Sequence, residues 1–147
     1  DHGLPYDPAN VVLSGWTRES GYETMSRFLD ERRDFDLVFC LTDMIAIGAL
    51  KALLDHGVGV PRDVAIMGFD GVRDGRYTSP GLSSVDIDVA QIASTCLDLL
   101  IERIDAVPRR QAPEKEHRTR SAADITPRTR TLDYRLVFRG SAERSRG

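Results

Sequence analysis

The sequence is poor in the residues that mark membrane-spanning, disulfide-rich or metal-binding proteins. Its 147 residues include 2 cysteines, 1 tryptophan and 3 histidines, and no apolar run approaches the roughly 20 residues that a membrane-spanning helix needs. Cys40 and Cys96 lie far apart and lack metal-ligand spacing, so we expect reduced, buried thiols and no metal site. The hydrophobic share of 41% still suffices for one domain with a core.

Signature motifs of enzymes are missing as well. The sequence contains no nucleophile elbow, no phosphate-binding loop and no GxGxxG motif. Its three histidines, His2, His56 and His117, are scattered along the chain. We therefore predict that the protein is not an enzyme and uses no cofactor.

The first residues show no sign of export. Residues 1–5 lack an initiator methionine and the basic and apolar regions of a signal peptide. We therefore expect a segment of a longer cytoplasmic protein that does not enter a membrane. The net charge is −3, with acidic residues in excess over 1–105 and basic residues in excess over 106–147. Because proline, threonine, serine and glutamate separate the arginines, we expect a solvated connector and tail rather than a nucleic-acid site.

The hydrophobic pattern predicts alternating strands and helices. Two buried strands, covered on both faces, are predicted over 35–41 and 63–69, and shorter strands over 11–13, 83–85 and 132–138, the last at a sheet edge. Three helices are predicted: one capped by Thr17 with apolar positions up to Leu29, one over 44–56 capped by Asp43 and stopped by Gly57, and one over 89–104 with an apolar stripe.

This order of elements predicts an α/β fold in which helices flank a parallel sheet. In such sheets, ligands bind beyond the carboxyl ends of the strands. Three groups of residues each follow a predicted strand: Trp16, Thr42 with Asp43, and Phe69 with Asp70. We therefore expect these groups to face one cleft.

Four stretches of the sequence carry a family resemblance. They are 42–50 (TDMIAIGAL), 57–70 (GVGVPRDVAIMGFD), 80–85 (PGLSSV) and the closing 136–141 (LVFRGS). In these positions and spacings the sequence resembles the LacI/GalR family of transcriptional regulators. The likeness extends over about residues 1–105 and 132–141.

The resemblance implies an effector-binding domain of the periplasmic-binding-protein-like type I fold, truncated mostly to its C-terminal lobe. Residues 1–88 would form that lobe, 89–105 a crossover helix toward the N-terminal lobe, 106–131 an Arg- and Pro-rich connector, 132–141 the last strand of the lobe, and 142–147 a tail. The helix-turn-helix that reads DNA would lie outside this chain.

The resemblance also implies a pocket for a small sugar-like or nucleoside-like effector. Trp16 would stack on a sugar or base, Thr42 would make a polar contact, and Asp70 would accept hydrogen bonds from the ligand. Ile87 and Val89 would lie on the crossover segment near the ligand. Other roles stay open: Trp16 as a cover of the core edge, Asp70 as a turn former, and Thr42 as a strand-end residue.

A homodimer and allosteric control are further implications of the resemblance. Helix 44–56 and the loop near Tyr77 would form the dimer face, with Ile47 and Tyr77 as contacts, whereas core packing is the alternative role of Ile47. Effector binding would change the angle between the lobes and thereby the binding of the operator. The rival interpretation is a solute-binding protein of a sugar transporter, which shares the fold.

Overall fold

The computed structural model describes residues 3, 7–32, 34–105 and 128–143. Most of the predicted connector, the end of the predicted tail, His2 and His117 lie outside the described residues. The chain divides into two compact units, of which the larger comprises residues 1–87 and 134–147 and the smaller comprises residues 88–133.

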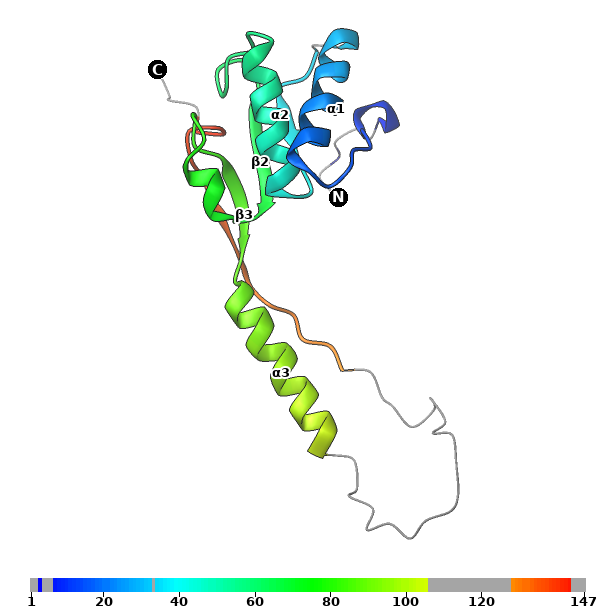
Figure 1. Cartoon of the computed structure of the whole chain (residues 1–147), viewed down its shortest axis with the longest axis vertical. Helices are drawn as coiled ribbons and strands as arrows, with labels where there is room; N and C mark the ends of the chain where they lie inside the picture. The colour runs from blue at the N-terminus through cyan, green and yellow to red at the C-terminus, as the bar shows by residue number, and fades with distance from the viewer. Residues whose placement is uncertain (1–2, 4–6, 33, 106–127, 144–147) are drawn as a thin grey trace. The chain divides into compact units, whose positions relative to one another are not determined.

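The larger unit is built on a four-stranded sheet (Figure 1). Its strands are β1 (Leu37–Phe39), β2 (Ala65–Asp70), β3 (Ser83–Ile87) and β4 (Tyr134–Val137), and they follow this order across the sheet. β1, β2 and β3 run parallel, whereas β4 pairs antiparallel with β3 and forms the far edge. The predicted α/β fold class is confirmed, with a sheet that is mixed because its last strand is antiparallel.

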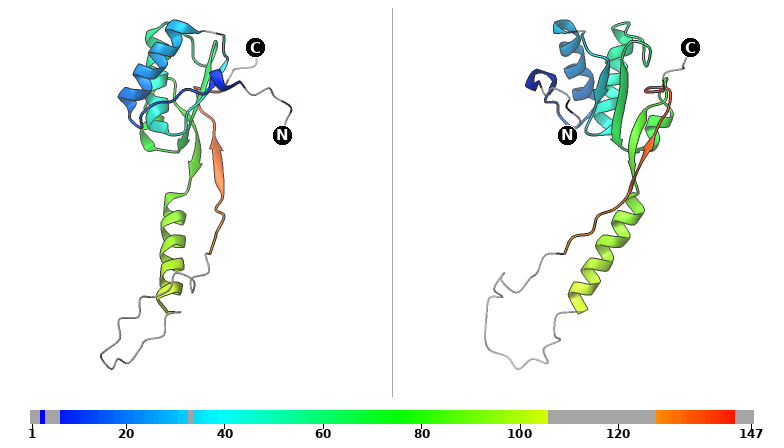
Figure 2. Two further views of the ribbon diagram at one scale, coloured as in Figure 1. Left: turned by 90° about the vertical axis from the view of Figure 1, so that its right-hand side faces the viewer. Right: turned by 180° about the vertical axis from the view of Figure 1, so that it is seen from behind.

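Two helices, α1 (Arg18–Glu31) and α2 (Asp43–Asp55), lie on the same face of this sheet (Figure 2). Thr17 caps α1 as predicted, because its hydroxyl accepts the backbone N–H of Ser20 at 3.1 Å. Gly57 follows α2 with a φ of +73°, the left-handed conformation expected of a glycine that stops a helix. The largest buried apolar side chains come from both helices, from β2 and from the residue before β3: Leu29, Leu50, Leu53, Ile66 and Leu82.

Glycines allow α1 and α2 to pack closely. A Cβ atom on Gly21 would lie 2.4 Å from the carbonyl oxygen of Ile45, and one on Gly48 would lie 1.9 Å from that of Arg18. Backbone atoms cannot move aside as a flexible side chain can. The two helices therefore approach each other at positions where only glycine fits.

The strand predicted at 11–13 is wrong. A short 3-10 helix, η1 (Pro8–Asn10), is followed by residues 11–13 without strand pairing. Their side chains are exposed, that of Leu13 to 90%. β-branched residues favour an extended backbone, but their strand preference depends on packing against neighbouring strands. Among the described residues, 11–13 have no neighbouring strand to pack against, so their β-branched pattern wrongly predicted a strand.

The prediction that the strand over 35–41 is covered on both faces is also wrong for the described part of the chain. Leu37 and Phe39 are 58% and 51% exposed, whereas Val38 between them packs against the helical core. Side chains alternate between the faces of a strand, and α1 and α2 cover one face only (Figure 2). The apolar side chains of β1 thus include a row that these helices do not reach.

The smaller unit contains the helix α3 (Val89–Asp105), whose first turn is capped by the Asp88 carboxylate bonded to the Gln91 N–H at 3.0 Å. As predicted, α3 carries an exposed apolar stripe. It consists of Val89, Leu97, Leu100, Ile101 and Ile104. Cys96 on this helix is exposed, so its predicted burial is wrong, while Cys40 is buried as predicted. Among the described residues, no helix combines the length and the apolarity that a membrane span requires.

Candidate functional site

The carboxyl end of β2 has an unusual backbone at Asp70. Its φ is +107°, and that of the next residue, Gly71, is +71°. A non-glycine residue with positive φ costs about 1–3 kcal/mol and persists only where its surroundings hold it. Gly71 cannot be replaced easily, since a Cβ atom there would lie 2.5 Å from Oδ1 of Asp86. The chain therefore makes a tight, strained turn directly after β2.

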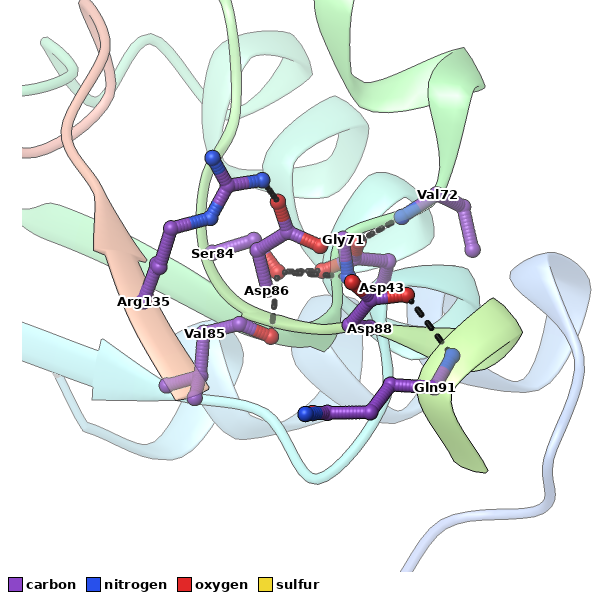
Figure 3. A network of polar contacts seen from close by, with 9 residues as sticks. All are labelled: Asp43, Gly71, Val72, Ser84, Val85, Asp86, Asp88, Gln91 and Arg135. Atoms are coloured by element: carbon purple, nitrogen blue, oxygen red, sulfur yellow. Dashed lines mark hydrogen bonds and ion pairs between the residues drawn. The ribbon is translucent and has the colours of Figure 1, made fainter. Parts of the chain in front are cut away.

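Side chains from two other elements hold this turn (Figure 3). The N–H of Gly71 donates to Oγ of Ser84 at 3.1 Å, and the N–H of Val72 donates to Oδ2 of Asp43 at 2.7 Å. Oγ of Ser84 in turn donates to Oδ1 of Asp43 at 2.7 Å. Both amides that follow Asp70 thus bind side chains, one from α2 and one from β3.

Asp43 does not cap α2, contrary to the prediction. Thr42 is the N-cap, and Asp43 is the first helical residue, with a side chain that is 1% exposed. Burial raises its pKa, while the hydrogen bonds from Ser84 and Val72 lower it. A spacing signal was available, because Asp43 stands three and seven residues before the buried Ala46 and Leu50 and therefore on the buried helix face.

Ser84 is a further residue that the sequence analysis did not select for the site. It is fully buried in β3, between Ser83 and Val85. Two adjacent serines in a buried strand are a weak signal, because each hydroxyl requires a partner and the sequence does not name it. The structure supplies these partners at opposite sides of the strand: Asp43 for Ser84, and the backbone of Arg139 for Ser83.

The Asp70 carboxylate itself has no hydrogen-bond or ion-pair partner among the described residues. It is half-buried, and burial raises its pKa. Its neighbour across the sheet is Asp86, whose carboxylate binds Arg135 at 2.6 Å (Figure 3). Of two adjacent acidic residues, Asp86 is neutralised by a cation and Asp70 is left with unused acceptor oxygens.

Thr42 lies at the amino end of α2, just after β1. Its Oγ1 accepts the N–H of Ile45 at 3.2 Å, so the side chain has a definite structural role as a helix cap. A hydroxyl can accept and donate at the same time. The side chain is half-buried, and within the described ranges its hydroxyl hydrogen has no acceptor, so it can donate to a ligand.

Trp16 immediately precedes the cap of α1, and its indole is 70% exposed. It lines a hollow of about 500 Å³ together with Leu13, Phe28, Phe39 and other residues of α1 and β1. Asp70 and Thr42 do not line this hollow. The structure nevertheless brings the start of α1 to the end of the sheet where β2 finishes (Figure 1).

An ion pair links these two places. Arg18, the first residue of α1, pairs with Asp74 of η2 (Arg73–Arg76), the 3-10 helix that follows β2. The segments that carry Trp16 and Asp70 are thus connected at one end of the sheet. Ile87 is the half-buried last residue of β3, and Val89 is the exposed first residue of α3.

The two residues predicted for a dimer face differ in exposure. Tyr77 is 87% exposed, while Ile47 is partly buried and packs against the core. Within the described ranges, His, Cys, Asp and Glu side chains form no cluster of three that could hold a metal ion. The chemistry at this end of the sheet is that of acceptor oxygens, a hydroxyl and an exposed indole.

Comparison with known proteins relates this chain to a family. Residues 1–142 match the family model described as periplasmic binding protein-like domain. The regulator MalR of Clostridium butyricum is 32% identical over 104 residues, which cover 71% of this chain and 31% of that protein. A LacI-family regulator of known structure from Sanguibacter keddieii is 42% identical, with a TM-score of 0.78, and the match covers 95% of this chain and 48% of that one.

A second solved structure is a LacI-family regulator from Arthrobacter sp. FB24 in complex with lactose. It is 31% identical with a TM-score of 0.69, and the match covers 88% of this chain and 43% of that one. The chain thus spans less than half the length of these proteins. Sequence and fold agree along nearly the whole chain, which belongs to the periplasmic binding protein-like domain family and is similar to the corresponding part of LacI-family regulators.

Proposed function

We propose that this chain is the effector-sensing part of a cytoplasmic LacI-type transcriptional regulator and binds a small sugar-like or nucleoside-like molecule beside Asp70. The DNA-binding module would belong to a part of the protein outside this chain. The relatives are transcriptional regulators, and one was solved with lactose. These relatives favour a sensor over the solute-binding protein of a transporter, and over an enzyme.

The state of Asp70 is the observation that carries this proposal. Its backbone is strained, its carboxylate has no partner among the described residues, and it lies at the carboxyl end of a parallel strand. Strained residues cluster at ligand sites because the surrounding fold holds them in one orientation. Each hydrogen bond from a ligand hydroxyl to this carboxylate would contribute about 1.5–3 kcal/mol.

Trp16 and Thr42 would complete the polar and apolar contacts. The exposed indole of Trp16 offers a flat apolar face to a sugar ring or a base. The Thr42 hydroxyl, which caps α2 through its oxygen, would donate its hydrogen to the ligand. Ile87 and Val89 would contact the apolar side of the ligand.

Control of DNA binding would follow from the unequal affinity of the effector for two arrangements of the lobes. In this proposal residues 1–88 and 132–141 form the C-terminal lobe and residues 89–105 cross toward the other lobe. A complete switch from one arrangement to the other requires a difference in binding of about 5.5 kcal/mol. Asp70 and Trp16 would supply part of that difference.

The regulator would act as a homodimer through the face that carries Tyr77 and helix α2. The high exposure of Tyr77 supports its role as a contact, and Ile47 would contribute with its exposed part. Sedimentation equilibrium of the full-length protein with Tyr77→Glu tests this arrangement. We expect a dissociation constant at least about tenfold higher than for the unchanged dimer, and an unchanged constant would contradict the proposed face.

The site itself is tested by a thermal-shift screen of sugars and nucleosides on the full-length protein, beginning with lactose, followed by calorimetry. Asp70→Asn is expected to weaken binding by roughly tenfold to a hundredfold, as expected for the loss of one charged hydrogen bond. Trp16→Leu should weaken binding by about threefold to tenfold through the loss of stacking. Asp30→Asn, at an exposed position near the end of α1, is the matched control and should bind as before. Equal affinities for Asp70→Asn and Asp30→Asn would disprove the proposed role of Asp70.

A further inference from the structure

The turn at Asp70–Gly71 owes its conformation to side chains from distant parts of the chain. The Gly71 and Val72 amides both point toward side-chain acceptors, Ser84 and Asp43. We propose that Asp43 and Ser84 are positioning residues, which hold this turn so that the Asp70 carboxylate is presented to the effector. The inference rests on the proposed function, since it concerns the same ligand site.

Hydrogen bonds connect Asp43, Ser84 and the turn. The Asp43 carboxylate uses one oxygen for the Val72 amide and the other for the Ser84 hydroxyl, both at 2.7 Å. The Ser84 hydroxyl donates to Asp43 and accepts from the Gly71 amide. The carboxylate, the hydroxyl and the two amides thus form one network, in which the Ser84 hydroxyl lies closer to Asp43, at 2.7 Å, than to the Val85 carbonyl, at 3.4 Å (Figure 3). Removal of either side chain leaves a backbone amide of the turn without its acceptor.

Asp43 also packs closely against β2. A Cβ atom on Gly68 would lie 2.2 Å from Oδ1 of Asp43, so the carboxylate rests directly on the backbone of the strand that ends in Asp70. The charge of Asp70 also raises the pKa of Asp43, in addition to the larger effect of burial, so the two carboxylates interact. Asp43 is therefore fixed relative to both the strand and the turn.

Ser83, the other buried serine of β3, has different partners. Its hydroxyl donates to the Arg139 carbonyl at 3.0 Å and accepts from the Arg139 amide at 2.8 Å. Ser83 thus stabilises the contact between β3 and the end of the chain, and it has no bond to the turn. Two buried hydroxyls that are adjacent in sequence therefore have different tasks, and this pair provides a matched control.

The test uses the full-length protein with Ser84→Ala, Ser84→Thr and Ser83→Ala. Hydrogen–deuterium exchange on peptides that cover residues 68–76 reports the turn without any ligand. We expect Ser84→Ala to accelerate exchange of the Gly71 and Val72 amides at least about tenfold. Ser84→Thr keeps the hydroxyl, so its exchange rates should stay within about twofold of those of the unchanged protein. Ser83→Ala should leave these two amides unchanged within about twofold. Unchanged exchange in Ser84→Ala would overturn the positioning role.

Affinity for lactose, the first probe of the site, separates positioning from a general loss of stability. Ser84→Ala should weaken lactose binding about tenfold in the unchanged background and by less than about twofold in an Asp70→Asn background, because the turn then has no carboxylate to present. If Ser84→Ala weakened lactose binding by the same factor in both backgrounds, Ser84 would not act through Asp70. If the unchanged protein binds no sugar, or if Asp70→Asn binds it equally well, the proposed function fails. The exchange experiment still decides whether the network that Ser84 forms with Asp43 holds the turn.

Discussion

The side chains of Asp43 and Ser84 meet at 2.7 Å, although they are 41 positions apart in the sequence. Their contact joins the first residue of α2 to the second residue of β3, and the backbone after β2 binds to both. A buried carboxylate that lost these partners would bear the cost of desolvation without compensation. The pair therefore supports three elements at the end of the sheet where the proposed ligand site lies.

The pH dependence of stability should reveal the burial of Asp43. Folding raises its pKa, with burial as the largest cause. The stability that a carboxyl with a raised pKa contributes is complete below its unfolded pKa of about 3.9 and is lost as pH rises through the higher folded value. We therefore expect the unfolding free energy of the unchanged protein, relative to Asp43→Asn, to fall as pH rises above about 4. Urea unfolding at several pH values measures this difference.

Asp63 provides a control of opposite sign. Its hydrogen bonds with Arg62 and the Gly59 amide lower its pKa to about 2. The contribution of Asp63 to the free energy of unfolding is present above its unfolded pKa and is lost as pH falls through its folded pKa. The advantage of the unchanged protein over Asp63→Asn should thus shrink toward pH 2. Parallel pH profiles for the two variants would show that the assignment of the shifts is wrong.

Substitution of Gly48 should disturb the packing of α1 on α2. A methyl group there would collide with the Arg18 carbonyl and lie 2.7 Å from the Tyr22 nitrogen, and both are backbone atoms. We expect Gly48→Ala to lower the unfolding free energy by about 1–3 kcal/mol or more, although alanine favours helix over glycine. Denaturant unfolding followed by circular dichroism measures the loss.

Gly57→Ala is the control for Gly48→Ala. A Cβ atom at Gly57 would have no heavy atom within 4 Å, so only the φ of +73° makes a side chain unfavourable there. Its cost should be about 1–2 kcal/mol, the strain of a left-handed residue. If Gly48→Ala proves as stable as the unchanged protein, the two helices are not in the close contact described.

The two cysteines should differ strongly in reactivity. Cys40 is buried, and burial raises the pKa of its thiol to about 12, whereas Cys96 is exposed on α3. Only the thiolate reacts readily with alkylating reagents. Brief treatment of the native protein with iodoacetamide should label Cys96 and spare Cys40, and mass spectrometry identifies the labelled peptide. Denatured protein, in which both should react, is the control, and native labelling of Cys40 would contradict its burial.

Loss of the α1 cap should weaken the segment that carries Trp16. The Thr17 hydroxyl accepts the Ser20 amide, and the Ser20 hydroxyl accepts the Thr17 amide, both at 3.1 Å. Thr17→Ala should cost about 0.5–2 kcal/mol of unfolding free energy, while Thr17→Ser keeps the oxygen and should cost little. Thermal unfolding of the two variants distinguishes them, and an equal loss in both would exclude the cap as the cause.

Sequence patterns predicted correctly those features that depend on residues close together in the chain. The cap at Thr17, the stop at Gly57 and the apolar stripe of α3 follow from residues that lie within a few positions of each other. The order of helices and strands predicted the α/β fold class, and the four motifs with their spacing added the family. The predictions that failed were a strand at 11–13 and the coverage of 35–41 on both faces. Both depend on which other segments pack beside these residues.

The sequence by itself determined the alternation of helices with the main strands, the cap of α1 and the family, since these depend on short-range geometry and on motifs with fixed spacing. Only the tertiary structure decided that Asp43 is a buried acceptor rather than a helix cap, that Ser84 is its partner, and that Asp70 remains unpaired among the described residues. Hydrogen bonds between residues distant in sequence arise when the sheet and helices come together, and no local pattern encodes which side chains then meet.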